Sequence, residues 1–315
     1  MKKIKNLSLL LLILSILTFF TPAKAELKVV TSIKPIHSLA SYLMDGIGKP
    51  DLIVDGYASP HGFSMKPSHA KMLQNADLIF WVGEDLESFL EKPLSSIAKK
   101  AEKIELMSIK ELTVLKFREK NISDKHDHKE KGGKHADHKE KVHDGHAHGK
   151  YDPHIWLDTM NAKAMLNEMA AHLIENDPKN EAKYKSNLDK ALKDIDKLTI
   201  EVMTDLSNSV SSIVFHDAYQ YFEKRFNVKV LGALTINTDV MPGAEQLVEI
   251  REIIEHDKVA CVFSEPQFNP DIINTVAKDM KIKTGVLDPL GATLDPGKDL
   301  YFKLIRNMSA SFKGC

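Results

Sequence analysis

Short apolar runs alternate with stretches of helical periodicity along most of the chain. The first part predicts four strands with helices between them, and a further helix at 161–175. The strands are expected at 28–31, 52–54, 78–82 and 103–106, and the earlier helices at 35–44, 68–74 and 84–100. Regular alternation of strand and helix is typical of a parallel sheet in an α/β domain.

The same alternation returns in the last hundred residues. Strands are expected at 212–215, 228–231, 259–263 and 284–287, and helices at 218–225, 243–256, 271–280 and 298–308. This pattern predicts a second α/β unit with its own parallel sheet.

The longest periodic segment, 179–206, lies between these two units. Its apolar residues recur three or four positions apart, which places them on one face of a single helix: Tyr184, Leu188, Ala191, Ile195, Leu198, Val202 and Leu206. A coiled-coil dimer seam is one interpretation. A helix packed along both units is favoured, because the stripe lasts fewer than four heptads. The predicted fold is therefore two Rossmann-like α/β lobes with parallel sheets, joined by one long backbone helix.

The N-terminal 25 residues have the pattern of a signal peptide. Lysines precede an apolar run at 7–20, and Ala23-Lys24-Ala25 offers a small-x-small cleavage site. An uncleaved membrane anchor is the alternative. A lipid anchor is not expected, because no cysteine lies near the cleavage site. The predicted organisation is thus a signal peptide (1–25), an N-terminal lobe (26–177), a linking helix (178–208) and a C-terminal lobe (209–315).

Charge excludes one class of partner. The chain has 43 Lys and Arg against 44 Asp and Glu, a formal net charge of −1. A nucleic-acid-binding protein would need a basic surface, so no nucleic-acid partner is expected. After the signal peptide no segment is apolar enough to span a bilayer. The signal peptide itself predicts export, with the periplasm as the expected location.

An insertion at 119–151 differs from the rest in composition. It has few apolar residues, so it cannot offset the entropy of ordering and is expected to be a solvated loop. Seven histidines lie in it: His126, His128, His135, His138, His143, His146 and His148. They are predicted to be weak, exchangeable metal ligands, and a merely solubilising insertion is the alternative.

Four further residues predict a fixed metal site. His61, His154 and His216 each stand just beyond an apolar run or turn, and Asp288 directly follows the strand at 284–287. Ligands of open α/β sheets bind at the carboxyl ends of strands, and two of these residues come from each lobe. Three imidazoles and one oxygen donor suit a tetrahedral zinc site. The sequence therefore predicts a zinc site in the cleft between the lobes.

The other four histidines are expected to be structural or solvated. His37 and His69 lie at predicted helix starts, and His172 and His256 lie late in predicted helices. A cationic imidazole near a helix C-terminus is favoured by the helix dipole.

The two cysteines, Cys261 and Cys315, are expected to form a disulfide. Export places them in an oxidising compartment, where pairing is the default. The rival interpretation is a pair of thiolate metal ligands.

Several motifs together resemble a known family. They are Ser-Pro-His-Gly-Phe-Ser-Met-Lys-Pro-Ser (59–68), Asp-Pro-His-Ile-Trp-Leu-Asp (152–158), Val-Phe-His-Asp-Ala-Tyr-Gln-Tyr-Phe (214–222), Ser-Glu-Pro-Gln-Phe (264–268) and Leu-Asp-Pro-Leu-Gly (287–291). In this order they resemble the zinc- and manganese-binding proteins of bacterial ABC importers, the metal-binding solute-binding protein family 9. The histidine-rich insertion and the cysteine pair resemble its zinc-specific, ZnuA-like branch.

The resemblance implies a fold, a function and a ligand set. It implies two lobes joined by a rigid helix, and a non-enzymatic, monomeric periplasmic protein that captures Zn²⁺ and delivers it to a membrane permease. His61, His154 and His216 take the family's ligand positions. Asp288 takes the fourth, with water as the alternative, since Pro60 stands where some zinc members have a glutamate.

Two other functions remain open at this stage. A zinc-dependent hydrolase could use three histidines and a water, but the sequence has no His-Glu-x-x-His helix and no acid placed obviously as a general base. A periplasmic metal buffer or chaperone could rely on the insertion alone. The buffer would bind several ions weakly, whereas a carrier would also have one tight site.

Overall fold

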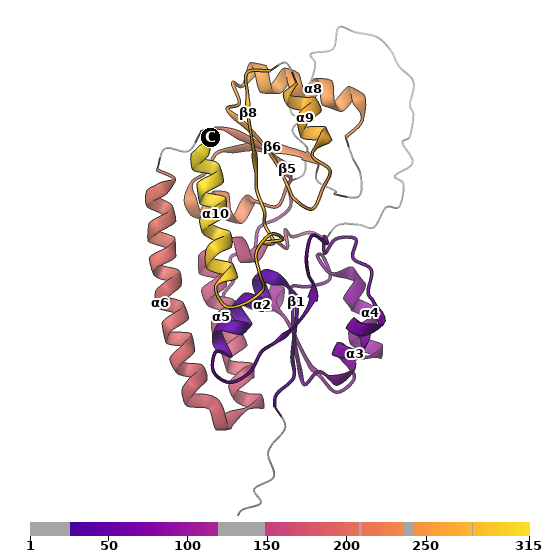
Figure 1. The fold of residues 1–315 in the computed structure, drawn as a ribbon, viewed down its shortest axis with the longest axis vertical. Helices are drawn as coiled ribbons and strands as arrows, with labels where there is room; N and C mark the ends of the chain where they lie inside the picture. Colours follow the sequence, from indigo (N-terminus) through magenta and orange to yellow (C-terminus); the bar gives the residue numbers. More distant parts are fainter. Residues whose placement is uncertain (1–25, 119–148, 208–209, 236–237, 239–241, 279) are drawn as a thin grey trace, which may run out of the picture.

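A computed structural model describes residues 26–118, 149–207, 210–235, 238, 242–278 and 280–315 (Figure 1). The predicted signal peptide and the seven histidines from His126 to His148 lie outside these residues. Within the described part, no helix has both the length and the apolar character that a membrane crossing requires.

The first sheet is parallel throughout, with strand order β2-β1-β3-β4. Its strands are β1 (Val29–Ile33), β2 (Asp51–Val54), β3 (Leu78–Trp81) and β4 (Glu102–Glu105), and its helices are α2 (Lys34–Leu43), α3 (Pro67–Asn75) and α4 (Ser88–Ser96). A short 3-10 turn, η2 (Leu106–Ser108), follows β4. Residues of β1 and β3 are almost wholly buried, as expected for the central strands of a sheet covered on both faces.

The second sheet repeats this plan with strand order β6-β5-β7-β8, again all parallel. Its strands are β5 (Ser212–His216), β6 (Val230–Thr235), β7 (Cys261–Ser264) and β8 (Lys283–Val286), and its helices are α7 (Gln220–Phe226), α8 (Ala244–His256) and α9 (Asp271–Ala277). Alternate residues of β5 face different cores: Val214 belongs to the large core shared with the first unit, and Ile213 and Phe215 to a smaller core under α8 and α9. The predicted α/β class with two parallel sheets is confirmed.

Three long helices complete the fold, and the second of them packs against both of the others. They are α5 (Thr159–Asn176), α6 (Glu181–Asp205) and α10 (Leu300–Gly314), with the turns η4 (Ile155–Leu157) and η5 (Pro178–Asn180) before α5 and α6. Figure 1 shows α6 extending along both halves of the molecule, with α10 next to it. The predicted stripe on α6 is buried at Tyr184, Ala191, Ile195, Leu198 and Val202. The long helix is therefore packed against its own chain along this face, as predicted.

The helix that differs most from its predicted length is α4. The pattern indicates a helix at 84–100, but α4 begins at Ser88 and ends at Ser96. Its late start is explained by Glu87, whose fully buried carboxylate accepts hydrogen bonds from the backbone N–H groups of Val82 (2.7 Å) and Gly83 (3.1 Å). These bonds fold the chain back after β3, and burial raises the pKa of Glu87 to about 7.

The predicted disulfide is present. Cys261 begins β7 and is fully buried, and Cys315 ends the chain after α10, with a Cα–Cα distance of 5.9 Å. The bond ties the C-terminal helix to a central strand of the second sheet. The rival interpretation, two thiolate metal ligands, is thereby wrong for this structure.

Candidate metal centre

Three of the four predicted site residues meet between the two sheets. His61 lies in the loop between β2 and α3, His154 immediately precedes η4, and His216 is the last residue of β5. His61 and His154 thus lie in loops and His216 at the end of a strand, where a side chain can point into the space between the lobes. His154 and His216 are buried and His61 is half-buried.

The three imidazoles are close enough to share one ion. One nitrogen from each ring lies within 4.8 Å of the other two. The Nε2 atoms of His154 and His216 are 3.4 Å apart. Four ligands at the usual zinc–nitrogen distance of about 2.05 Å would be separated by roughly 3.3 Å in a tetrahedron. The spacing of these two nitrogens therefore fits a zinc ion between them.

Asp152 orients His154. One oxygen, Oδ1, accepts from His154 Nδ1 (2.7 Å) and from its backbone N–H (3.0 Å), while Gln220 donates to the other oxygen (3.1 Å). Burial lowers the pKa of His154 well below its ordinary value, and burial raises the pKa of Asp152 to about 7. The contact is thus a hydrogen bond from a neutral imidazole, which leaves the Nε2 lone pair directed into the site.

Glu265 plays the same part for His216. It follows β7 and accepts from His216 Nδ1 at 2.6 Å, and both side chains are almost fully buried. Burial alone would lower the pKa of His216, but the charge and hydrogen bond of Glu265 outweigh it, so this pKa is raised. His216 is therefore protonated more readily than His154, and it must lose that proton before its Nε2 can bind a metal.

A small cavity separates the three rings. It has a volume of about 10 Å³ and is lined by the three histidines together with Trp156, Glu265 and Leu290, among others. Space of this size holds about one water-sized body. The cavity therefore matches a single ion rather than an organic ligand.

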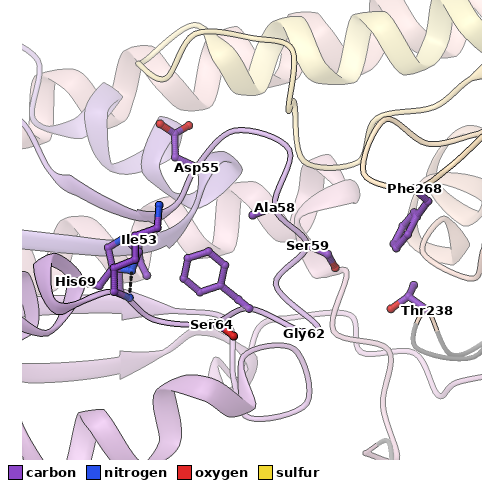
Figure 2. Close-up of a pocket in the computed structure, with 11 residues that line it drawn as sticks. Ile53, Asp55, Ala58, Ser59, Gly62, Ser64, His69, Thr238 and Phe268 are labelled. Atoms are coloured by element: carbon purple, nitrogen blue, oxygen red, sulfur yellow. Dashed lines mark hydrogen bonds between the residues drawn. The ribbon is translucent and has the colours of Figure 1, made fainter.

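A larger pocket of about 460 Å³ adjoins this cavity, and both are lined by Ser59 and Phe268. Figure 2 shows Ser59 and Gly62 of the His61 loop facing Phe268 and Thr238 of the second half across it. The small cavity and the larger pocket are therefore neighbours that share these two residues.

Asp288, the predicted fourth ligand, does not join the three histidines. One carboxylate oxygen accepts from Gln267 Nε2 (3.0 Å) and from the backbone N–H of Leu290 (3.3 Å). The other accepts from the backbone N–H of Thr293 at 3.4 Å. In this arrangement its hydrogen bonds support the turn after β8.

Three of the four remaining described histidines have polar partners away from the site. His37 Nε2 contacts the carbonyl of Pro50 (3.2 Å), His69 Nδ1 accepts from the N–H of Lys66 (3.1 Å), and exposed His256 contacts Asp257 (2.8 Å). These three fit the structural or solvated roles expected of them.

Sequence reasoning missed Asp152 and Glu265. Both lie in motifs that the resemblance highlights, yet neither was given a role. A signal was present for Glu265, because it follows a central strand as His216 does, and neighbouring parallel strands bring such residues together. For Asp152 the signal was its spacing of two residues from His154, which allows an Asp side chain to accept a nearby backbone N–H.

Residues 29–315 match a protein-family model, which is described as zinc-uptake complex component A, periplasmic. The high-affinity zinc uptake system protein ZnuA of Brucella abortus (strain 2308) is 42% identical over 303 residues, covering 91% of each chain. The protein of the same description from Yersinia pestis is 37% identical over 297 residues, covering 92% of each chain.

Solved structures agree on the fold. A crystal structure of ZnuA covers 91% of this chain and 100% of its own, with a TM-score of 0.73 and 21% identity. The periplasmic zinc binding protein TroA from Treponema pallidum covers 92% and 99%, with a TM-score of 0.75 and 18% identity. The fold is shared with both, and by its family-model match and the identity of its relatives this chain belongs to the ZnuA family, the periplasmic component A of zinc-uptake complexes.

Proposed function

We propose that this protein captures Zn²⁺ in the periplasm and delivers it to an ABC-type membrane permease for import. The observation that carries the proposal is the group of three imidazole nitrogens within 4.8 Å of one another around a one-ion cavity, in a chain of the ZnuA family. The relatives' description as high-affinity zinc uptake proteins supports zinc as the cargo and a permease as the partner.

His61, His154 and His216 are the proposed protein ligands. With both Nδ1 atoms committed to carboxylates, the Nε2 atoms of His154 and His216 present two lone pairs to each other at 3.4 Å. Such a pair is unfavourable unless a cation or a proton lies between them, and imidazole nitrogen suits zinc. We propose water as the fourth ligand, since the oxygens of Asp288 are engaged by Gln267 and two backbone N–H groups.

The proposed role is transport rather than catalysis. A zinc hydrolase needs a base beside the metal-bound water. The two buried carboxylates nearest the rings, Asp152 and Glu265, each accept a hydrogen bond from a histidine Nδ1 and so serve to orient the ligands. We further propose that a signal peptide directs export and is cleaved after Ala25. The mature protein is proposed to act as a monomer and to bind no nucleic acid.

We expect Glu265→Gln to weaken zinc binding by about 10–100-fold near pH 8, the usual cost of losing a carboxylate behind a metal-bound histidine. The amide of glutamine accepts a weaker hydrogen bond from the Nδ1–H of His216 than the carboxylate does, and the substitution removes the charge that raises the pKa of His216. Protons therefore compete less with zinc for His216 in the variant. The difference in zinc affinity between variant and wild type should become smaller as the pH is lowered. Calorimetric titrations at several pH values measure both effects.

The control for this substitution is Glu252→Gln, on the exposed face of α8, which removes a carboxylate of the same kind far from the rings. It should bind zinc as wild type does at every pH. Wild-type affinity in Glu265→Gln would show that Glu265 does not position a zinc ligand.

Replacing the seven histidines from His126 to His148 by serine distinguishes a zinc carrier with one tight site from a metal buffer that relies on the insertion. The insertion's histidines are proposed as weak auxiliary ligands, because each bound arrangement must overcome the entropy of fixing a polar segment. We expect the variant to keep one tight zinc site of unchanged affinity and to lose the weaker equivalents, as counted by calorimetry. Deleting Asp124 to Gly149 should give the same result.

The two variants should also grow less well than wild type only when a chelator makes zinc scarce. A buffer that relied on the insertion would lose all binding in both variants. That outcome would refute the proposed carrier function.

A further inference from the structure

A second group of metal-binding side chains lies at the other end of the first sheet. Glu102 is the first residue of β4, so it stands at the amino end of that parallel sheet, opposite the carboxyl ends near which the three histidines meet. His172 and Glu175 lie in the last turns of α5. One ligand atom from each of these three residues lies within 4.8 Å of the other two.

The geometry of the His172 ring is unusual. Its Nδ1 atom is buried and lies 2.8 Å from Glu102 Oε1, yet the pair lacks the geometry of a hydrogen bond. The other nitrogen, Nε2, lies 3.3 Å from Glu168 Oε1 and hydrogen-bonds to it. If Nε2 carries the proton, Nδ1 presents a lone pair to a carboxylate oxygen, and this contact is unfavourable unless the two atoms share a proton or a metal cation.

Neighbouring groups hold the donors in place. Asn176 Nδ2 donates to Glu102 Oε2 (2.7 Å) and to the backbone carbonyl of His172 (2.9 Å), which fixes the strand residue against the end of the helix. Glu168 steadies the far side of the ring. The site is thus partly ordered before any ion arrives, which reduces the entropy lost on binding.

The local charge also favours a cation. Glu102, Glu168 and Glu175 surround one imidazole, and among the described residues none of the three forms an ion pair with a lysine or arginine. The C-terminal end of α5 adds the negative end of a helix dipole. A divalent ion would relieve this excess of negative charge.

We infer that Glu102, His172 and Glu175 form a second zinc site, weaker than the site between the lobes and completed by water. One imidazole with two carboxylates is a donor set that zinc accepts, whereas magnesium and calcium prefer oxygen alone. The bound ion joins the edge strand β4 to the corner between α5 and α6. It therefore stabilises the first half of the molecule when zinc is abundant and leaves the affinity of the three-histidine site unchanged.

The test follows the ring nitrogens of His172 by ¹⁵N NMR while zinc alone is added to the complete mature protein beyond the first equivalent. His172→Gln identifies the signals. We expect Nδ1 to shift with added zinc, and Glu175→Gln to move the midpoint of that shift to at least about tenfold higher zinc. Glu175 is exposed, so its substitution should not disturb folding. Glu91→Gln, an exposed position on α4, serves as the matched control and should behave as wild type.

Two results would overturn the inference. One is a His172 ring that responds to pH but not to zinc, which would mean that a proton bridges the ring and Glu102. The other is an identical zinc response in wild type and Glu175→Gln, which would assign the effect to zinc bound elsewhere. The histidine-rich insertion is the same in all these proteins, so its binding does not affect the comparison.

Discussion

Replacing His154 by alanine should lower the affinity for zinc by more than about 100-fold. The substitution removes one of three proposed ligands. The loss of affinity should exceed the roughly 10–100-fold that is typical when a residue hydrogen-bonded to a metal ligand is removed. It also leaves Asp152 buried without the imidazole that it orients. Calorimetric titration measures the loss, and His61→Ala and His216→Ala should behave alike.

Two variants serve as controls for this prediction. His256→Ala removes a 77% exposed imidazole at the end of α8, outside the group of three histidines, and it should not change zinc affinity. Asp288→Asn should lower the zinc affinity less than His154→Ala does, because the Asp288 carboxylate lies outside the group of three nitrogens.

A cell that makes only the His154→Ala protein should fail to grow under a zinc chelator. Wild-type affinity in His154→Ala would contradict the assigned site.

Removing the disulfide should destabilise the protein by up to about 4 kcal/mol. The bond closes a loop with a sequence separation of 54 residues, and the chain-entropy model gives this value as an upper figure for such a loop. Cys261→Ala combined with Cys315→Ala is the appropriate variant, because Cys261 is fully buried and alanine adds no polar group there. Denaturant unfolding without reductant measures the free-energy difference.

Reductant provides the control for the disulfide. It should destabilise the wild type to about the level of the double variant and leave the double variant itself unchanged. Zinc affinity should be the same in both proteins, because neither cysteine belongs to the group of three histidines. Equal stability of wild type and double variant, or a loss of the tight zinc site, would contradict this account of the bond.

The sequence predicted most of the architecture because the elements carry strong periodic signals. The helix at 179–206 has an unbroken apolar stripe, and α6 spans Glu181–Asp205 with that stripe buried. Each predicted strand is found within a few residues of its expected place. The helix expected at 84–100 was too long, since a periodic pattern does not reveal that the Glu87 carboxylate turns back to bind the backbone after β3.

The candidate site was only partly predictable. The strand-end position of His216 was predicted correctly, because β5 ends at this residue on the side of its sheet that faces the cleft. His154 also meets His216 as expected, but it lies in the turn before η4 and not at the end of a strand. Their assignment as zinc ligands, with His61, stays a prediction. Sequence alone gave no distances, so it could not separate Asp288 from the three rings or reveal that Glu265 orients His216.

The group around His172 lay beyond sequence reasoning for a different reason. Helical periodicity relates His172 to Glu168 and Glu175, which are four and three residues away on the same helix face. It does not reveal that Glu102, on an edge strand 70 residues earlier, reaches the same ring. His172 was therefore expected to be structural or solvated, and only the tertiary packing of β4 against the end of α5 suggests a metal site.

The central claim is that one zinc ion lies between His61, His154 and His216. Its most direct test is a crystal structure of the zinc-loaded protein with anomalous data collected on both sides of the zinc edge. We expect the strongest anomalous peak within about 2.0–2.1 Å of Nε2 of His154, Nε2 of His216 and one ring nitrogen of His61. A fully loaded protein whose strongest zinc peak lies elsewhere, with no peak among these three rings, would contradict the account.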